Sequence, residues 1–373
     1  MTNGLDTEAR EALREEALKW VAGSYPDSRR RSAAASPGSR DAEVWAELAA
    51  LGWLGLMVPE AHGGAGAGAA EFAALAEAIG AGLVAEPVTM SGGVVVRLLR
   101  GAASDRDLAA IASGETVATF AHQEAASGYD RDRVEARAHA VGGEVALDGT
   151  KVAVVAAEAA DLFFVTARDE AGALAVFRVP ADAPGVEVRG YRAICGRRIG
   201  DVVLAGVRLP AAARVTGQDD ASALVDDVLD FGALLGASET LGAMDALLGD
   251  TAAYLAARKQ FGRPLSSFQV LQHRMVDLFI RLEEARGAVE TALATIDGDA
   301  ADRRAAVAVA RAVAGRAANA IGREAVQLHG GMGVSDELRI GHLFKRCLVE
   351  ASRNGDADWY RRRFQNLEAG RIG

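Results

Sequence analysis

The sequence predicts an α+β protein in which a β-rich middle part lies between two helical parts. From Asp6 to about Arg100, apolar residues recur at the spacing of amphipathic helices. Between Glu115 and Leu209 the pattern changes to short apolar runs bounded by Gly, Asp and Pro, which is typical of strands. Helical spacing returns at Ser222 and continues nearly to the end. We therefore expect three domains, at residues 1–112, 113–215 and 216–373.

Two helical stripes define the first part. They consist of Leu13, Ala17, Trp20 and Val21, and of Val44, Leu48, Leu51 and Leu54. The segment between them, Pro26 to Ser39, is rich in Arg, Ser and Ala, and we expect a polar loop there. A third helix is predicted from Ala70 to Ile79, because Gly80 and Gly82 follow it.

The middle part contains several candidate strands. They are Thr116 to Phe120, Glu144 to Leu147, Asp161 to Thr166, Ala173 to Val179 and Asp201 to Val207. Gly142-Gly143 is predicted to be the turn of a hairpin between two strands. A small antiparallel β-domain fits this pattern.

The last part contains the most apolar long segment of the chain, Arg304 to Gly322. Arg311 and Arg316 interrupt it, and two charges at membrane depth would be costly, so we expect a core helix. Helices in this part are predicted to end near Gly262, Gly298 and Gly330.

Composition excludes several classes of protein. The chain has 373 residues, of which 50% are hydrophobic and 25% charged, so it can bury real cores without disulfides. Its net charge of -10, with no long Lys or Arg run, does not suggest a nucleic-acid partner. Cys195 and Cys347 form no metal-binding spacing and favour a reducing compartment. Met1 to Arg14 is polar and acidic, which disfavours a secretory signal, so we expect a cytoplasmic protein.

The most specific motif is Arg258-Lys259-Gln260-Phe261-Gly262-Arg263-Pro264-Leu265, followed by Phe268-Gln269. It lies where one predicted helix ends and the next begins. A guanidinium fork matches the oxygens of a phosphate, and a tight Gly-Arg-Pro turn fixes the direction of the fork. A plain helical corner with a surface Arg is the alternative interpretation.

A second motif is Gln327-Leu328-His329-Gly330-Gly331-Met332-Gly333. Two adjacent glycines allow the backbone to approach a ligand closely. Taken alone, a Gly-Gly pair after a helix is more often only the end of that helix.

In this order along nearly the whole chain, the segments resemble the acyl-CoA dehydrogenase family. The resemblance includes Leu51-Gly52-Trp53, Val58-Pro59-Glu60, Gly63-Gly64, Glu77 and Glu86-Pro87 in the first part. It implies a helical N-domain, a β-barrel-like middle domain and a C-terminal four-helix bundle, with FAD bound between the last two. By this resemblance, the FAD contacts in the last part are Arg258, Gln260, Phe261, Gln269, Gln327, His329, Gly330 and Gly331. Some of them would reach a neighbouring subunit, which implies an oligomer.

The middle part departs from the family pattern. Where the family has Thr-Glu-Pro-Gly and Gly-Ser-Asp around the flavin, this chain has Gln123 for the Thr and Tyr129 for the Ser. His122, Gln123 and Gly128 are nevertheless the expected flavin contacts there. Ala153 stands where a family Trp packs on the flavin, so the surroundings of the ring must differ.

Family chemistry needs a carboxylate to remove a proton from the acyl thioester. At the two usual family positions this chain has Asn354 and Gly232, which cannot take a proton. Glu239 lies in an apolar run and shares the face of Gly232, about 10 Å further along the helix. Burial would raise its pKa to a useful value, and we predict it as the catalytic base. A buried Glu satisfied by a nearby Arg or backbone amide is the alternative, and it carries slightly more weight.

Two further carboxylates are weaker candidates for the base. Asp230 precedes Gly232 by two residues and should point elsewhere, toward the CoA end or the helix start. Glu350 lies one turn before Asn354, and we expect a solvated side chain there. Four of the six histidines, His62, His139, His273 and His342, show no ligand spacing, so no metal is expected.

The resemblance implies an FAD-dependent oxidoreductase of fatty acid metabolism that desaturates an acyl-CoA thioester between its α and β carbons. It implies electron-transfer flavoprotein as the electron acceptor and a homotetramer or heterotetramer as the assembly. Because the base is missing from both usual positions, a non-catalytic or half-site subunit of a hetero-oligomer is one alternative. A flavin-dependent oxygenase on the same fold is another, since the flavin surroundings are altered.

Overall fold

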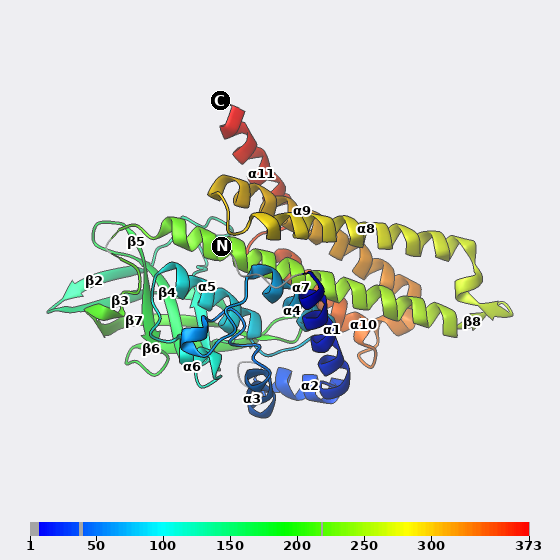
Figure 1. The fold of residues 1–373 in the computed structure, drawn as a ribbon, viewed down its shortest axis with the longest axis horizontal. Coiled ribbons are helices and arrows are strands. Elements are labelled where there is room, and N and C mark those ends of the chain that lie inside the picture. The colour runs from blue at the N-terminus through cyan, green and yellow to red at the C-terminus, as the bar shows by residue number, and fades with distance from the viewer. Residues whose placement is uncertain (1–6, 37–39, 218, 373) are drawn as a thin grey trace. The chain divides into compact units, whose positions relative to one another are not determined.

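The computed structural model describes residues 7–36, 40–217 and 219–372, and Figure 1 shows their fold. Helices occupy the chain up to Ala112, strands β1 to β7 lie between Ala118 and Pro210, and helices follow from Ser222 to Ile372. The predicted order of helical, β and helical parts is confirmed. Among the described residues, no helix has both the length and the apolarity needed to cross a membrane.

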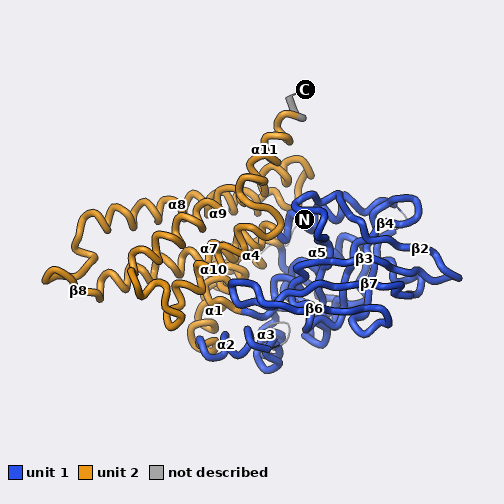
Figure 2. Tube along the Cα trace, turned by 180° about the vertical axis from the view of Figure 1, so that it is seen from behind, with its two compact units in different colours: residues 1–4, 27–68, 85–232 blue, residues 5–26, 69–84, 233–373 orange. Residues whose placement is uncertain are grey.

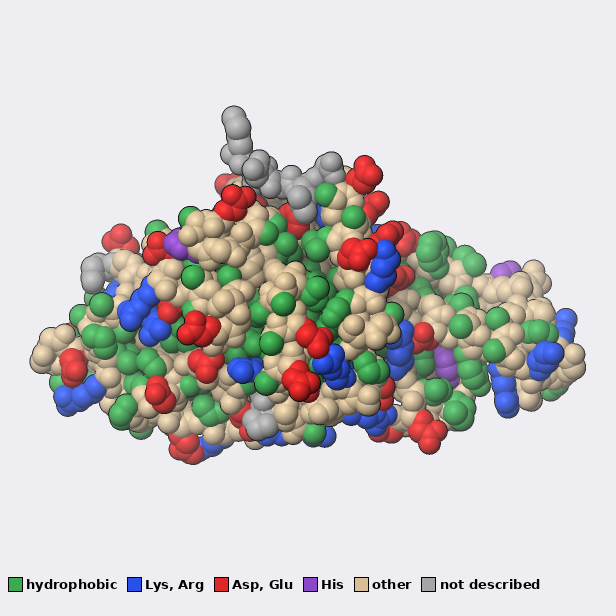
Figure 3. Space-filling model, turned by 60° about the horizontal axis from the view of Figure 1, so that its bottom comes forward, with side chains coloured by type: hydrophobic (Ala, Val, Ile, Leu, Met, Phe, Trp, Pro, Cys, Tyr) green, Lys and Arg blue, Asp and Glu red, His purple; other side chains and the backbone are tan. Residues whose placement is uncertain are grey.

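The chain divides into two compact units, which Figure 2 distinguishes by colour. Unit 1 contains residues 1–4, 27–68 and 85–232, and unit 2 contains residues 5–26, 69–84 and 233–373, as far as these are described. Both units are thus built from segments that are distant in sequence. On the face shown in Figure 3, acidic and basic side chains are interspersed.

The first helices are α1 (Thr7–Ser24), α2 (Asp27–Ala35), α3 (Ala42–Ala50), α4 (Ala69–Ala81), α5 (Val96–Gly101) and α6 (Leu108–Ala112). The loop predicted for Pro26 to Ser39 is wrong over the range of α2. Asp27 accepts hydrogen bonds from Arg30 and Arg31, three and four residues later, and ion pairs at this spacing stabilise a polar helix. The last three positions of that segment, and Met1 to Asp6 of the acidic start, lie outside the described residues.

Unit 1 contains a seven-stranded sheet in the order β1-β4-β2-β3-β7-β6, with β5 paired to β4. Its strands are β1 (Ala118–Ala121), β2 (Arg137–Val141), β3 (Glu144–Val155), β4 (Leu162–Arg168), β5 (Leu174–Pro180), β6 (Val186–Arg192) and β7 (Arg198–Pro210). The five predicted strands are present as β1, β3, β4, β5 and β7. The predicted hairpin turn is confirmed, because Gly142 and Gly143 have φ of 60° and 87° between the paired β2 and β3.

The sequence did not predict β6. This strand is half-buried to exposed along its whole length and pairs only with β7, so no buried face imposes an apolar alternation on it. β4 is the opposite case. Phe163 and Phe164 are fully buried on it, and the neighbouring strand β5, which pairs with it, carries the buried Phe177.

The last helices are α7 (Ser222–Ala257), α8 (Gln269–Thr295), α9 (Ala300–His329), α10 (Arg339–Ser352) and α11 (Ala357–Ile372). The core helix predicted from Arg304 to Gly322 is confirmed as the middle of α9, where Arg311 is buried. The ends predicted near Gly298 and Gly330 are also confirmed, since α8 ends at Thr295 and α9 at His329.

Within unit 2, helices α4 and α7 cross in very close contact at two glycines. A Cβ atom added to Gly80 would lie 1.9 Å from the carbonyl oxygen of Glu239, and one added to Gly242 would lie 1.8 Å from that of Glu77. Only glycine fits at these positions. The crossing therefore places the carboxyl-bearing residues Glu77 and Glu239 inside the helix interface.

Candidate functional site

In unit 1, the loop that follows β1 is organised around the carboxylate of Glu124. The Glu124 side chain is buried and accepts hydrogen bonds from the backbone N–H groups of Glu135 at 2.6 Å and Ala136 at 3.1 Å. Lys151 Nζ donates to the same carboxylate at 2.5 Å. One carboxylate thus fixes residues from the loop, from the chain entering β2 and from β3.

Lys151 lies in the interior of β3 with no exposed surface. Its ammonium group donates to Glu124, to the carbonyl oxygen of His122 at 3.2 Å and to Thr166 Oγ1 at 3.0 Å. Burial lowers the pKa of Lys151 to about 8, while the carboxylate of Glu124 acts in the opposite direction. A buried charge with three acceptors is a strong constraint on the position of this loop.

The predicted flavin contacts His122, Gln123 and Gly128 lie in this loop. His122 is buried and its Nδ1 lies 3.1 Å from Thr166 Oγ1. Burial, followed by the charges of Lys151 and Arg131, lowers the pKa of His122 to about 3, so the imidazole is neutral at physiological pH. Gln123 donates its side-chain N–H to the carbonyl oxygen of Gly128, which has a φ of 54°.

Ala153, the position of the absent aromatic ring, is exposed and has a φ of 53°. Its backbone N–H donates to Tyr191 Oη and to Asp201 Oδ1, both at 3.2 Å. Tyr191 in turn donates to Asp201 at 2.9 Å. The amide of Ala153 is therefore engaged within unit 1, and an exposed aromatic ring lies close to it.

In unit 2, the motif that begins at Arg258 forms a small hairpin after α7. Strands β8 (Lys259–Gln260) and β9 (Arg263–Pro264) pair with each other. Phe261 and Gly262 form the turn with φ of 54° and 79°, a left-handed conformation that is unusual for Phe. Phe261 is 89% exposed.

The other predicted contacts of this motif are also exposed. Arg258 and Gln260 lie on the surface next to the turn, and Gln269 is the first residue of α8. Within the described chain, the Arg258 guanidinium makes no ion pair. An exposed aromatic ring thus follows an uncompensated guanidinium by three residues.

The second motif lies at the end of α9. His329 is buried, its Nδ1 lies 2.8 Å from the carbonyl oxygen of Ala325, and its ring stacks on Tyr254 with a centroid distance of 4.3 Å. Tyr254 also donates its hydroxyl to the carbonyl oxygen of His329 at 3.3 Å. Because Tyr254 lies one helical turn before Arg258, this contact brings the two motifs to the same end of unit 2.

At Gly330 and Gly331 of the second motif, the backbone is accessible to a ligand. Gln327 is exposed, and Gly330 has a φ of 60° and a ψ of -141°, which a residue with a Cβ disfavours. A Cβ atom added to Gly330 or Gly331 would meet nothing within 4 Å. An open glycine backbone, a free guanidinium and an exposed ring fit a ligand that carries both phosphates and an aromatic ring, such as a dinucleotide.

Glu239, the predicted base, is fully buried and forms an ion pair with Arg346. Arg346 Nη1 lies 3.2 Å from Glu239 Oε2 and also donates to the carbonyl oxygen of Val84 at 3.4 Å. These contacts match the alternative interpretation of Glu239, in which a nearby Arg satisfies a buried carboxylate. Nothing in it brings the carboxylate to a surface, and its role as a base stays a prediction.

The other two carboxylates are buried ion-pair members as well. Asp230 has no exposed surface and accepts from Arg131 at 2.6 Å within unit 1. The expectation of a solvated Glu350 is wrong, because its side chain is buried and pairs with Arg353 at 2.9 Å. Gly236 of α7 leaves room for this cluster, since a Cβ atom there would lie 3.2 Å from Glu350 Oε2.

The two positions that lack a carboxylate differ in environment. Gly232 is buried, and a Cβ atom there would lie 3.3 Å from Val94, so the site has little room for a long side chain. Asn354 lies in the turn between α10 and α11, is half-buried and has a φ of 61°. Of the two, Asn354 is the side chain that a ligand could contact.

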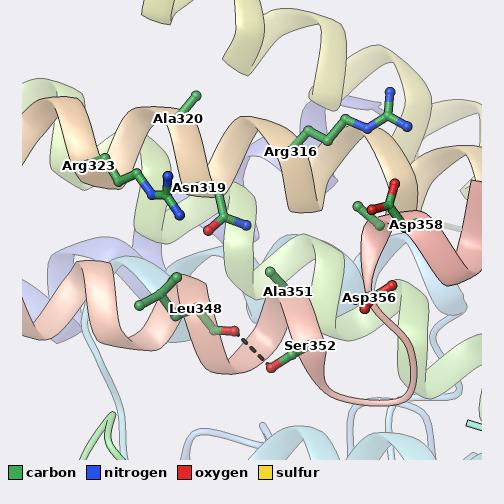
Figure 4. Close-up of a pocket in the computed structure, with 10 residues that line it drawn as sticks. Arg316, Asn319, Ala320, Arg323, Leu348, Ala351, Ser352, Asp356 and Asp358 are labelled. Carbon is green, nitrogen blue, oxygen red and sulfur yellow. Dashed lines mark hydrogen bonds between the residues drawn. The ribbon is translucent and has the colours of Figure 1, made fainter.

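A hollow of about 630 Å³ lies beside this turn, between α9, α10 and the start of α11. Figure 4 shows Arg316, Asn319 and Arg323 along α9, with Leu348, Ala351 and Ser352 on α10 and Asp356 and Asp358 at the start of α11. Its two arginines and two aspartates balance in charge. The hollow therefore favours neither an anion nor a cation.

Sequence reasoning missed the two groups that organise the loops of the site. Lys151 is not among the predicted site residues, although a Lys in a run of Val and Ala within a strand indicates a buried, paired charge. Arg311 was treated as a cost of burial rather than as a structural centre. The structural role of Arg311 was harder to recognise from the sequence, since its partners are backbone carbonyls of a distant turn.

Comparison with known families decides what this arrangement is. The chain matches the models for the acyl-CoA dehydrogenase N-terminal domain over residues 7–115, the middle domain over residues 119–207 and the C-terminal domain over residues 223–364. The chain belongs to the acyl-CoA dehydrogenase family. Acyl-CoA dehydrogenases are FAD-dependent oxidoreductases, which agrees with the exposed dinucleotide-type motifs of unit 2.

Similar acyl-CoA dehydrogenases include FadE12 of Mycobacterium tuberculosis, which is 30% identical over 92% of this chain and 91% of its own length. IpdE2 of Mycolicibacterium smegmatis is 30% identical over 97% of this chain and 99% of its own. Among solved structures, a chain of the ChsE4-ChsE5 complex from Mycobacterium tuberculosis is 27% identical, with a TM-score of 0.88 and 98% coverage of both chains. The predicted α+β fold of this family is confirmed.

The ion pair in the middle domain can be tested by substitution. Lys151→Met leaves the Glu124 carboxylate buried without its cation, and we expect unfolding free energy to fall by about 3 kcal/mol or more at neutral pH. The double variant with Glu124→Gln should recover part of this loss. Denaturant unfolding of the four proteins of the cycle measures both effects.

The lowered pKa of Lys151 predicts that the unfolding free energy depends on pH. Native Lys151 releases its proton at about pH 8 and the unfolded chain at about 10.5, so between these values the unfolded state binds more protons. The stability of the wild type relative to Lys151→Met should therefore rise with pH over this window. A constant or falling difference would contradict the lowered pKa.

Proposed function

We propose that this chain desaturates an acyl-CoA thioester between its α and β carbons, with FAD as hydride acceptor. The observation that carries the proposal is the hairpin of unit 2, in which Phe261 is exposed in a strained turn beside the unpaired Arg258. The Phe261 ring meets Phe268 edge-on with a centroid distance of 6.1 Å but stays largely exposed, and Arg258 makes no ion pair within the described chain. Both are accounted for if FAD contacts this hairpin.

Arg258 would hold the FAD pyrophosphate through its guanidinium fork, and Gly330 and Gly331 would let the backbone approach it. Gln260, Phe261, Gln269, Gln327 and His329 are the other contacts proposed in unit 2, and His122, Gln123 and Gly128 are those proposed in unit 1. Bound FAD supplies the oxidised ring that takes a hydride from the substrate. The ion pair of Lys151 with Glu124 would keep the unit 1 loop in place for this contact.

Arg258→Ala should weaken FAD retention by about ten- to a hundredfold, because a charge-assisted bond to phosphate is lost. Lys259→Ala is the matched control, since it removes an adjacent exposed cation that is not assigned to the cofactor. Flavin content after gel filtration and the dissociation constant of added FAD measure the effect. An equal loss in both variants, or none in Arg258→Ala, would contradict the assignment.

Two candidate mechanisms differ in which carboxylate acts as the catalytic base. In the first, Glu239 removes the α-proton after leaving Arg346. In the second, a partner subunit supplies the carboxylate and this chain is half of a shared site. The buried pairing of Glu239, Asp230 and Glu350 favours the second, as does the likeness to a chain of the ChsE4-ChsE5 complex.

Anaerobic addition of acyl-CoA separates the two candidates. If Glu239 is the base, the isolated flavin-loaded chain is bleached, and Glu239→Gln slows bleaching by about a hundredfold or more. If a partner supplies the base, the isolated chain stays yellow and bleaches only after co-expression with a relative that carries the carboxylate. A chain that stays yellow with every acyl-CoA and every such partner contradicts both.

The assembly and its partners are part of the proposal. We infer a homotetramer or heterotetramer, and the exposed apolar side chains Val276, Phe279 and Ile280 of α8 support a subunit contact on that helix. Electron-transfer flavoprotein is the proposed electron acceptor. Free, buried thiols at Cys195 and Cys347 support a reducing compartment, with the cytoplasm as the proposed location.

A further inference from the structure

A β-bulge in the sheet of unit 1 adjoins the loop that follows β1. Two residues of β3, Val152 and Ala153, lie opposite the single residue Asp201 of β7, where the register of the two strands shifts. The Val152 N–H donates to the carbonyl oxygen of Gln123 in that loop at 2.8 Å, and Ala153 is exposed beside it. Bulges often re-aim side chains next to binding sites.

The side chain of Tyr191 reaches this bulge from β6, which lies on the other side of β7. The Tyr191 hydroxyl donates to Asp201 Oδ1 at 2.9 Å and accepts from the Ala153 N–H at 3.2 Å. Burial, followed by the hydrogen bond to Asp201, raises the pKa of Tyr191, so the phenol keeps the proton that it donates. The hydroxyl is therefore anchored at the bulge.

Tyr191 differs from an ordinary surface tyrosine in which part of it the protein engages. A surface tyrosine usually lays its ring against the protein and leaves its hydroxyl in water. Tyr191 instead commits its hydroxyl to the protein while 40% of the residue stays exposed. Ile194, three residues later in the turn before β7, is 64% exposed. This hairpin thus presents an aromatic ring and an aliphatic side chain at the surface of unit 1.

We propose that Tyr191 is a further cofactor contact, whose ring packs against the flavin ring of FAD. This inference rests on the proposed function, which assigns Gln123 of the adjoining loop to the flavin. The bulge residues Val152 and Ala153 are aliphatic, so Tyr191 supplies the aromatic surface there. Two aromatic rings in offset or edge-on contact attract each other beyond the area that they bury. Because the hydroxyl is anchored, little side-chain freedom is lost when the cofactor binds.

Removing the ring should weaken the binding of FAD but not that of ADP. In Tyr191→Leu, we expect the dissociation constant of FAD to rise about two- to tenfold, because one ring-to-ring contact is lost. ADP carries the pyrophosphate and adenine without the flavin ring, so its dissociation constant should stay unchanged. Tyr191→Phe keeps the ring and should recover most of the affinity for FAD. Calorimetric titration of the flavin-free full chain measures both ligands.

The fluorescence of the bound flavin reports the contact itself. A phenol ring that touches an excited flavin quenches its emission by giving up an electron and then taking it back. Phenylalanine is much harder to oxidise and does not quench in this way. Tyr191→Leu and Tyr191→Phe should therefore both make the bound flavin brighter than in the wild type, although only Tyr191→Leu loses much affinity.

Ile194→Ala is the matched control for both measurements. It removes exposed apolar surface from the same hairpin without removing a ring, so affinity for FAD and flavin fluorescence should stay at wild-type values. Equal losses of FAD affinity in Ile194→Ala and Tyr191→Leu would overturn a contact that depends on the ring.

Hydrogen exchange tests the anchor of the ring without any ligand. In Tyr191→Phe, the Ala153 amide keeps Asp201 as an acceptor but loses the tyrosine hydroxyl, so its exchange should speed up about two- to tenfold. The neighbouring Val152 amide donates to Gln123 and should keep its rate. An unchanged rate at Ala153 would overturn the anchoring.

The outcomes separate this contact from the proposed function. Unchanged FAD affinity and unchanged flavin fluorescence in Tyr191→Leu overturn the ring contact, while bleaching of the flavin by acyl-CoA would still support the proposed function. Equal weakening of FAD and ADP in Tyr191→Leu also overturns it, because a loss confined to the flavin ring cannot affect ADP. A wild-type chain that binds no flavin, alone or with a partner, overturns the contact together with the proposed function.

Discussion

Charged groups in the interior of this protein are held by side chains of opposite charge or by backbone carbonyls, and this constraint shapes both its fold and its chemistry. The helices of unit 2 are rich in Ala and cross closely at Gly80 and Gly242, so water is excluded around Glu239. A carboxylate there needs a cation, which Arg346 supplies. The Glu239 carboxylate therefore stabilises the fold. It must leave Arg346 before it can accept a proton from a substrate.

Buried cations also hold segments in place in the middle domain and in the turn before α11. Lys151 holds the loop of His122 and Gln123 through Glu124, and Arg311 holds the turn of Asn354 through backbone carbonyls. In both places a buried cation fixes a segment that lies between regular elements. An acyl-CoA dehydrogenase can thereby keep the shape of its site while the side chains in it differ from the family pattern.

Much of the fold could be predicted from the sequence, because strong periodicity and glycine stops mark the helices and most strands. The predictions failed where local pairing or distant contacts decide the outcome. Helix α2 depends on ion pairs of Asp27, and β6 depends on its pairing with β7. Glu350 is buried because Gly236 of another helix makes room for it, which no local pattern reveals. For the site, the motifs of Arg258 and Gly330 were evident as sequence, and their contact with FAD stays a prediction.

The buried carboxylates Glu239, Asp230 and Glu350 are each paired with an arginine, and on the proposal favoured above they serve the structure rather than the reaction. The most direct measurement is an experimental structure of the flavin-loaded protein with an acyl-CoA analogue that cannot react. We expect the Glu239 carboxylate to remain on Arg346. A Glu239 carboxylate that has left Arg346 and contacts the α-carbon would contradict the account.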